Sequence, residues 1–111
     1  MIEKITLDYL KSKFDIPVLL EVPAKIPPVF ILIEKTGSSR TNQIESSTLA
    51  VQSWADSMYK AAGLNDEVKA EMLNMVDLDE VSAVRLNSDY NYTDTETKSY
   101  RYQAVFDITL Y

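Results

Sequence analysis

Hydrophobic residues recur along this chain with two different periods, one typical of helices and one typical of strands. At the start, the apolar residues of 2–14 share one face when plotted at 100° per residue, whereas Lys4, Asp8 and Lys11 lie on the opposite face. At the end, residues 100–110 alternate between a mostly apolar set and a mostly polar set. We therefore predict an amphipathic helix at 2–14 and a half-buried strand at 100–110.

Four shorter stretches are predicted to be strands because of their apolar patterns. The most apolar of them, VFILIEK, is almost unbroken, which is typical of a strand covered on both faces and central in its sheet. The stretch that begins near Ser46 alternates, with Leu49 and Val51 on one face and Ala50 and Gln52 on the other. The four ranges are 17–22, 29–35, 46–52 and 81–87.

Polar and proline-containing segments separate these strands. VPAKIPP holds three prolines and is expected to form a stiff turn. GSSRTNQIE at 37–45 and SDYNYTDTETK at 88–98 contain almost no apolar side chain, so we expect a polar loop at the first and a hairpin loop at the second. Because little burial would offset their ordering entropy, both segments are expected to be mobile until a partner docks against them.

The stretch STLAVQSWADSMYKAA changes from strand-like alternation to a helical composition. Ser53 is a good N-cap residue and Asp56 stands three positions later, so a short helix is predicted at 54–62. Gly63 is its expected C-cap, and Asn65 is the expected N-cap of a second helix. Two helices, or one helix kinked at the glycine, fit the pattern equally well. The inward stripe consists of Leu64, Val68, Met72, Met75 and Val76.

The order of these elements is helix, three strands, one or two helices, and two strands. This order predicts an α+β fold, in which a mostly antiparallel sheet of about five strands carries two or three helices packed on one face. At 111 residues the chain is expected to be a single domain spanning 1–111.

Composition excludes several classes of protein. The chain has no cysteine, so no disulfide framework can form, and it has no histidine. Its net charge is −6, and its three arginines and eight lysines are scattered, so tight binding to DNA is not expected. The N-terminus has no apolar signal-peptide core, and no apolar run approaches the roughly 20 residues of a membrane span. We therefore expect a soluble protein made in a cytoplasm.

Without histidine or cysteine, catalysis could rest only on carboxylates, Ser–Lys pairs, tyrosine or metals held by oxygen. Asp77, Asp79 and Glu80 could hold a metal, but their segment lacks the glycine and distal glutamate of a calcium loop and is expected to be a solvated linker. We expect no enzymatic activity, no cofactor and no metal ion. The same interpretation applies to a second alternating set of oxygen donors, Asp89, Asn91, Thr93 and Asp94.

Aromatic residues favour binding over chemistry. Trp54 is expected to belong to the core, with its ring closing the end of the sandwich, and a ligand-stacking or hot-spot role is the alternative. Tyr90 and Tyr92 fall in a predicted loop, and tyrosine is enriched at protein interfaces. The chain is therefore interpreted as an assembly or binding module.

The segments occur in an order found in one known family. A proline-rich turn precedes VFILIEKTG, and a polar loop with Arg40 and Asn42 follows. The strand TLAVQSWA then runs directly into an alanine-bearing helix, and the chain ends in the aromatic strand YRYQAVFDITLY. From about Val18 to Tyr111 the chain resembles the tail terminator proteins of long-tailed bacteriophages. Members often carry Gly-Gly after the Arg/Lys-Thr end of the strand that corresponds to VFILIEKTG, where this chain has Gly37-Ser38-Ser39.

This resemblance implies a structural virion protein that forms a hexameric ring on the head-proximal end of the tail tube. Such a ring stops tube polymerisation and joins the filled head, without catalysis or a cofactor. Its partners would be further copies of itself, the major tail tube protein and a head completion or connector protein, with no membrane. DNA would only pass through the lumen, and an acidic lumen would let it slide because repulsion removes phosphate contacts. Assembly is expected in the cytoplasm of the host bacterium.

Four residues are the candidate contacts with neighbouring subunits or the tube: Arg40, Asn42, Tyr90 and Tyr92. Two alternative functions remain open. One is another head–tail connector or minor tail protein, and the other is a small non-catalytic ligand-binding module with Trp54 and the methionines lining a pocket.

Overall fold

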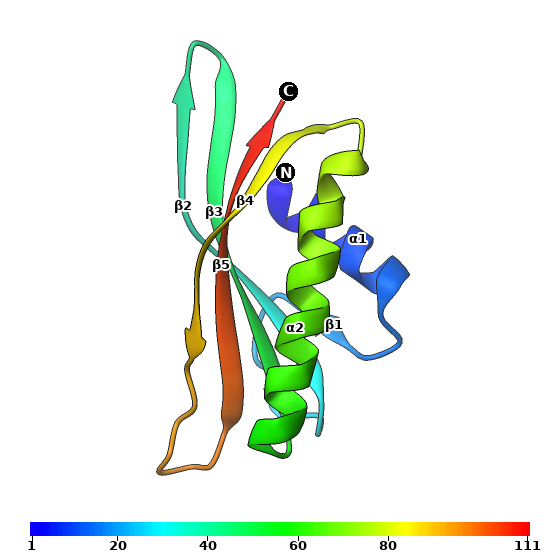
Figure 1. Ribbon diagram of the computed structural model, residues 1–111, viewed down its shortest axis with the longest axis vertical. Helices are drawn as coiled ribbons and strands as arrows, with labels where there is room; N and C mark the ends of the chain where they lie inside the picture. Colours follow the sequence, from blue (N-terminus) through cyan, green and yellow to red (C-terminus); the bar gives the residue numbers. More distant parts are fainter.

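The computed structural model describes residues 1–111 as one five-stranded sheet with two α-helices on one face (Figure 1). The strand order is β1-β2-β3-β5-β4; β1 is parallel to β2, and every other pair is antiparallel. The predicted α+β fold is confirmed. The elements are α1 (Ile2–Lys13), β1 (Val18–Leu19), β2 (Phe30–Thr41), β3 (Ile44–Ala55), α2 (Met58–Asn74), the 3₁₀ helix η1 (Met75–Asp77), β4 (Val81–Asn91) and β5 (Tyr100–Leu110).

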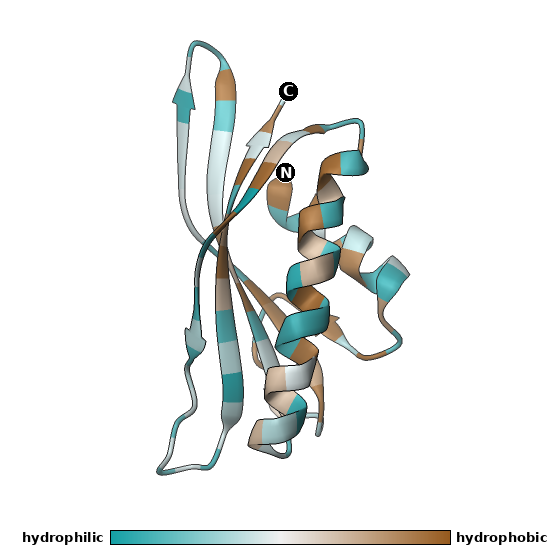
Figure 2. Ribbon diagram, in the orientation of Figure 1, coloured by the Kyte–Doolittle hydropathy of each residue, from teal (hydrophilic) through white to brown (hydrophobic).

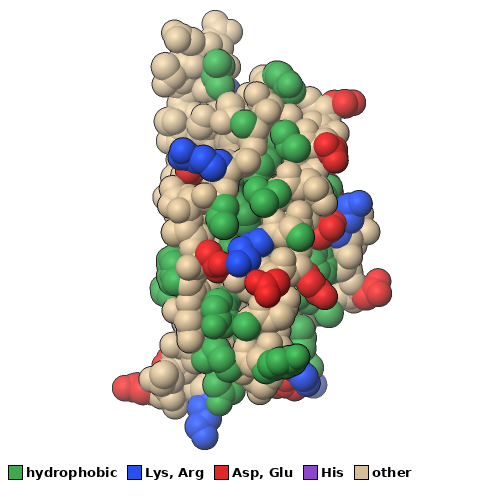
Figure 3. Space-filling model, viewed as in Figure 1, with side chains coloured by type: hydrophobic (Ala, Val, Ile, Leu, Met, Phe, Trp, Pro, Cys, Tyr) green, Lys and Arg blue, Asp and Glu red, His purple; other side chains and the backbone are tan.

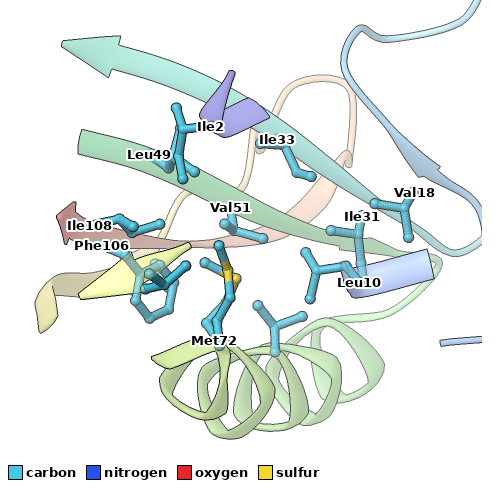
Figure 4. Packing of buried hydrophobic residues seen from close by; sticks show 14 of the residues in the cluster. Ile2, Leu10, Val18, Ile31, Ile33, Leu49, Val51, Met72, Phe106 and Ile108 are labelled. Carbon is cyan, nitrogen blue, oxygen red and sulfur yellow. The ribbon is translucent and has the colours of Figure 1, made fainter. Parts of the chain in front are cut away.

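The main core lies between the sheet and the helices, on what we call the inner face of the sheet (Figure 4). Met72 of α2 points toward Phe106 and Ile108 of β5, and Leu10 of α1 lies near Ile31 of β2. All five side chains are fully buried. The helices stay in place because their apolar stripes cover alternate residues of the strands beneath them.

A second, smaller cluster lies on the opposite side of the sheet, which we call the outer face. It consists of Phe30, Leu32 and Trp54, with Leu19 packed against it. Phe30 and Leu32 alternate along β2 with Ile31 and Ile33 of the main core, and alternate residues of a strand point to opposite faces. Trp54 is therefore buried, as expected, but on the outer face and not between the sheet and a helix.

The predicted polar loop at 37–45 is wrong, because β2 and β3 continue through it as a long hairpin. Its turn is only two residues, Asn42 and Gln43, with φ angles of 52° and 65°. Two successive positive φ angles match the twist of antiparallel strands, and asparagine tolerates the first position better than most residues. Every residue from Glu34 to Ile44 is exposed, and the hairpin projects beyond the helices (Figure 1; its hydrophilic character is visible in Figure 2). Polar composition alone cannot distinguish such a hairpin from a loop.

The predicted short helix at 54–62 is also wrong in its bounds. β3 runs on to Ala55, Ser53 is fully buried within it, and α2 begins after Ser57, whose hydroxyl accepts a hydrogen bond from the backbone N–H of Lys60 at 3.2 Å. Gly63 is not a C-cap, since α2 is one helix that passes through it. Of the two arrangements left open by the sequence, the structure has a single helix.

The remaining expectations differ mainly in length. β4 extends to Asn91, so the first residues of the predicted loop at 88–98 are strand, and β1 keeps only two of its six predicted residues. β2 has a neighbouring strand on both sides only at Ile31 and Leu32, where β1 pairs with it, so it is not the central strand that we predicted. The helix predicted at 2–14 and the strand at 100–110 are confirmed.

Candidate assembly surface

The four candidate contact residues form two pairs at opposite ends of the molecule. Arg40 and Asn42 lie at the tip of the β2–β3 hairpin, whereas Tyr90 and Tyr92 lie at the other end, where β4 leads into the β4–β5 turn (Figure 1). The molecule is 44 Å long, so the two pairs cannot contact one small-molecule ligand together. All four residues are exposed.

Tyr92 belongs to a row of side chains that crosses the outer face of four strands, which we call the aromatic row. Phe30 of β2 stacks on Trp54 of β3, with ring centroids 5.0 Å apart. The Arg101 guanidinium carbon of β5 lies 4.5 Å from the Trp54 ring centroid and 5.1 Å from that of Tyr92. Tyr90 meets Tyr92 edge to face, at 6.0 Å between centroids. The guanidinium is thus held in contact with two aromatic rings.

A hydrogen-bonded chain runs beside the aromatic row. The indole N–H of Trp54 donates to the side-chain oxygen Oε1 of Gln52 at 2.8 Å. The side-chain nitrogen Nε2 of Gln52 donates to Oε1 of Gln103, also at 2.8 Å. The Gln103 amide in turn donates to the Tyr90 hydroxyl. These bonds fix the orientation of the Trp54 ring and of the Tyr90 ring, because each polar side-chain group in the chain has its hydrogen-bonding partner in the next side chain.

Sequence reasoning found the two tyrosines of this surface but missed Arg101, Gln52 and Gln103. Arg101 and Gln103 are polar members of the β5 alternation, so the period-2 pattern placed them on the face away from the helices. Their neighbours come from β3 and β4, which are distant in sequence, and only the strand order brings the side chains together.

Two stretches of strand edge have no partner strand. β4 is the last strand of the sheet, and its outer edge is unpaired from Val81 to Asn91. On the other side, β1 covers β2 only at Ile31 and Leu32, so the edge of β2 is open from Ile33 to Thr41. Unpaired edges present rows of backbone N–H and C=O groups that can pair with another chain.

Exposed apolar side chains accompany the β4 edge. Leu73 of α2, Val76 of η1 and Leu86 of β4 are 44%, 43% and 37% exposed. Figure 3 shows hydrophobic side chains at the surface along the boundary between the sheet and α2. A strand that paired with β4 would have an apolar surface beside it.

Asp89 ties β4 to α2 from the inner face. Its carboxylate accepts hydrogen bonds from Lys69 Nζ at 2.6 Å and Asn65 Nδ2 at 2.7 Å. Burial alone would raise the pKa of Asp89, but the hydrogen bonds from Lys69 and Asn65 outweigh it and hold that pKa below its usual value. The same bond from Lys69 to Asp89 raises the pKa of Lys69. Asn65 is therefore a buried tether and not the predicted N-cap.

Removing this carboxylate is expected to destabilise the protein. Asp89→Ala should lower the free energy of unfolding at pH 7 by about 1–3 kcal/mol, because the buried Asn65 amide loses its acceptor. The folded-state pKa of Asp89 is depressed, so its contribution is present above the unfolded pKa of about 3.9 and is lost as the pH falls through the folded pKa. Urea denaturation at pH 7 and in acid measures both effects.

The control for this prediction is Asp66→Ala. Asp66 also pairs with Lys69, at 3.4 Å, but its side chain is 79% exposed, so little change is expected. Equal losses in the two variants, or a loss for Asp89→Ala that does not diminish in acid, would show that the tether is not the cause.

The predicted oxygen-donor sets have structural roles or face solvent. The Asn91 side-chain oxygen accepts a hydrogen bond from the Thr93 backbone N–H at 3.0 Å, and that of Asp94 accepts one from the Glu96 N–H at 3.1 Å. Both bonds shape the turn between β4 and β5. Asp77, Asp79 and Glu80 are exposed, and acidic side chains do not gather anywhere in groups of three that could hold a metal ion.

Trp54 and the two methionines of the main core do not line a common pocket. Trp54 lies in the outer cluster, whereas Met72 and Met75 are fully buried in the main core on the inner face. The sheet separates them, so they line no common cavity.

None of the helices is long and apolar enough to cross a membrane.

Comparison with known families and with curated proteins gives no further assignment. No family model matches the chain, and no curated protein matches it.

Proposed function

We propose that this chain is a structural protein of the tail terminator type, which forms a closed ring of identical subunits at the head-proximal end of a bacteriophage tail tube. The observation that carries the proposal is the pair of unpaired strand edges on opposite sides of one sheet. The acidic net charge of −6 and the resemblance of residues Val18 to Tyr111 to terminators support it. The protein is proposed to be non-catalytic and to reside in the virion tail.

The two edges favour a ring over a two-fold dimer. Within the sheet β4 runs opposite to β2, because three antiparallel pairings separate them. Rotation about an axis along the strands preserves these directions, so β4 of one copy would meet β2 of the next in an antiparallel arrangement. Contacts between two different surfaces of identical subunits close into rings when the rotation closes. The projecting hairpin with Arg40 and Asn42 would then be available to the tube or to the head connector.

Cysteine cross-linking tests this arrangement, because the natural chain contains no cysteine. Ser39 and Ala83 are exposed, lie on β2 and β4, and stand at the same level of the sheet through the pairings Ser39–Ser46, Ser46–Thr109 and Thr109–Ala83. The variant carrying both Ser39→Cys and Ala83→Cys should give a ladder of covalent oligomers with a short bis-maleimide. Each single variant is the matched control and should give no ladder.

The outcomes separate the alternatives. Efficient dimers of the Ala83→Cys variant alone would indicate β4–β4 pairing and a two-fold dimer. Rings seen by electron microscopy without a cross-linked ladder would support the proposed function but show that the subunits do not meet at the edges of β2 and β4.

Function is tested on tail tubes that are growing from their own tube protein. Added protein should stop elongation and appear as a ring at one end of each tube. Tubes that elongate unchanged, with no density added at either end, would contradict the terminator function. Density at a junction without arrest of growth would favour the runner-up, another head–tail connector or minor tail protein.

A further inference from the structure

Arg101 is a cation without an anionic partner. Five other cationic side chains of the chain make ion pairs, among them Arg85 with Asp107 at 2.8 Å, but Arg101 makes none. Its Nε is buried and has no hydrogen-bond acceptor. A buried N–H without an acceptor is costly, so most are satisfied in native proteins. The chain keeps this cost although it contains 17 acidic residues.

The surroundings of Arg101 hold its guanidinium in place. The rings of Trp54 and Tyr92 both contact it, and the indole of Trp54 is itself oriented by its hydrogen bond to Gln52. Planar guanidinium groups bind carboxylates through two parallel hydrogen bonds, and a rigid guanidinium loses less entropy when it does so. The site is therefore organised before any ligand arrives.

The composition of the surrounding surface is that of a protein contact. Tyr92 and Trp54 contact the guanidinium of Arg101, and Tyr90 packs against Tyr92; the two tyrosines are 46% and 41% exposed, Tyr92 being the more exposed. Tryptophan, tyrosine and arginine are the residues most enriched among those that dominate binding energy at interfaces.

Asp94, the carboxylate whose pKa the charge of Arg101 helps to lower, is already engaged in other hydrogen bonds. Asp94 is close enough for Arg101 to contribute to the lowering of its pKa, but hydrogen bonds from Thr97 and Glu96 are the larger causes. Asp94 holds the β4–β5 turn and makes no ion pair with Arg101. The guanidinium thus remains available to an anion from outside.

We propose that Arg101, held by Trp54 and Tyr92, is the anchor of a docking site for an acidic segment of a different protein, one of whose carboxylates pairs with the guanidinium. A nucleic acid would require a track of cations, whereas this chain carries 11 lysines and arginines against 17 acidic residues, a net charge of −6. The choice of a different protein over a second copy rests on the proposed ring, in which copies meet at the strand edges and leave the outer face open.

The single tryptophan of the chain reports on this site directly. A capped peptide of alternating glycine and glutamate is titrated against the protein, and Trp54 fluorescence is followed. We expect a saturable change, with at least tenfold weaker binding of the peptide in which glutamine replaces glutamate. Arg101→Leu should abolish the change, and Arg101→Lys should weaken binding about tenfold because a point charge replaces the planar fork. Lys25→Leu removes an exposed cation that makes no ion pair; it is the matched control and should bind normally.

Thermal unfolding distinguishes a binding role from a structural one. If Arg101 serves binding, Arg101→Leu should not lower the melting temperature, because the variant removes a buried N–H that has no acceptor. A lowered melting temperature together with undiminished peptide binding would overturn the proposal.

Three further results would also overturn it. The first is an equal response to the glutamate and glutamine peptides, and the second is preferential binding of an oligothymidylate. The third is a change of Trp54 fluorescence with protein concentration, without peptide, that Arg101→Leu abolishes; it would indicate that a second copy binds here. The cross-linked ladder of the edge variants does not involve Arg101. A ladder without peptide binding would therefore reject the docking site alone, whereas peptide binding without rings would reject the proposed ring.

Discussion

Replacing Trp54 by alanine should lower the free energy of unfolding by about 3–5 kcal/mol, as expected for truncating a large buried aromatic residue. Its side chain is only 8% exposed and stacks on Phe30 at 5.0 Å between centroids. The variant would also leave the Gln52 carbonyl oxygen without its indole donor and Arg101 without one of its two aromatic contacts. Urea denaturation followed by circular dichroism measures the loss, since the variant has no tryptophan to report by fluorescence.

Trp54→Phe is the matched control for this experiment. Phenylalanine keeps a ring against Phe30 but cannot donate to Gln52, so it should lose less than half as much stability as alanine. A soluble alanine variant with an unchanged melting temperature would show that the indole is not part of a core and would leave it free for direct contact with a ligand.

Phe106→Ala should cost a similar amount, about 3–5 kcal/mol, for a different reason. Phe106 is fully buried on the inner face, in the main core beneath α2, and has no polar group to satisfy. The loss there is cavity formation and lost apolar burial alone. Denaturation of Phe106→Ala and of the milder Phe106→Leu measures it; a leucine variant as unstable as the alanine variant would indicate strain in place of a cavity.

The two clusters lie on opposite faces, so their losses should add. The mild variants Trp54→Phe and Phe106→Leu are suited to this comparison, because the two alanine variants together could exceed the stability of a small domain. The double variant is expected to lose the sum of the single losses to within about 0.5 kcal/mol. A larger deviation would mean that the sheet transmits strain between its faces.

Regular periodicity made parts of the fold predictable. The helix of residues 2–13 and the strand of residues 100–110 were recognisable because each buries one continuous face, and burial leaves a period in the sequence. The outer half of the β2–β3 hairpin buries nothing, so its serines and threonines carry no such period. There the backbone pairing is encoded mainly by the two-residue turn at Asn42 and Gln43.

The junction after β3 could not be resolved from local signals. Ser53 and Ser57 are equally suitable N-caps, and both are followed by helix-forming residues. Trp54 and Ala55 are in the strand conformation because both pair with β5, opposite Arg101 and Tyr100. That pairing joins residues about 45 positions apart, which no local pattern records.

The candidate site was predictable only in part for the same reason. Tyr90 and Tyr92 could be proposed from residue type and polar surroundings. The position of Arg101 beside them depends on the pairing of β4 with β5 and of β5 with β3. The aromatic row is a property of the strand order, and a residue list cannot reveal it.

The projecting half of the β2–β3 hairpin has a consequence for how this protein can evolve. From Gly37 to Ile44 its side chains are exposed and lie outside both hydrophobic clusters. Surface substitutions of this kind usually change stability by no more than about 0.5 kcal/mol. Apart from Asn42 and Gln43, whose positive φ angles restrict the residues that fit the turn, descendants of this sequence can therefore exchange the exposed residues of this half almost without cost to the fold. A lineage could acquire new partners there while the rest of the chain stays under the constraint of packing.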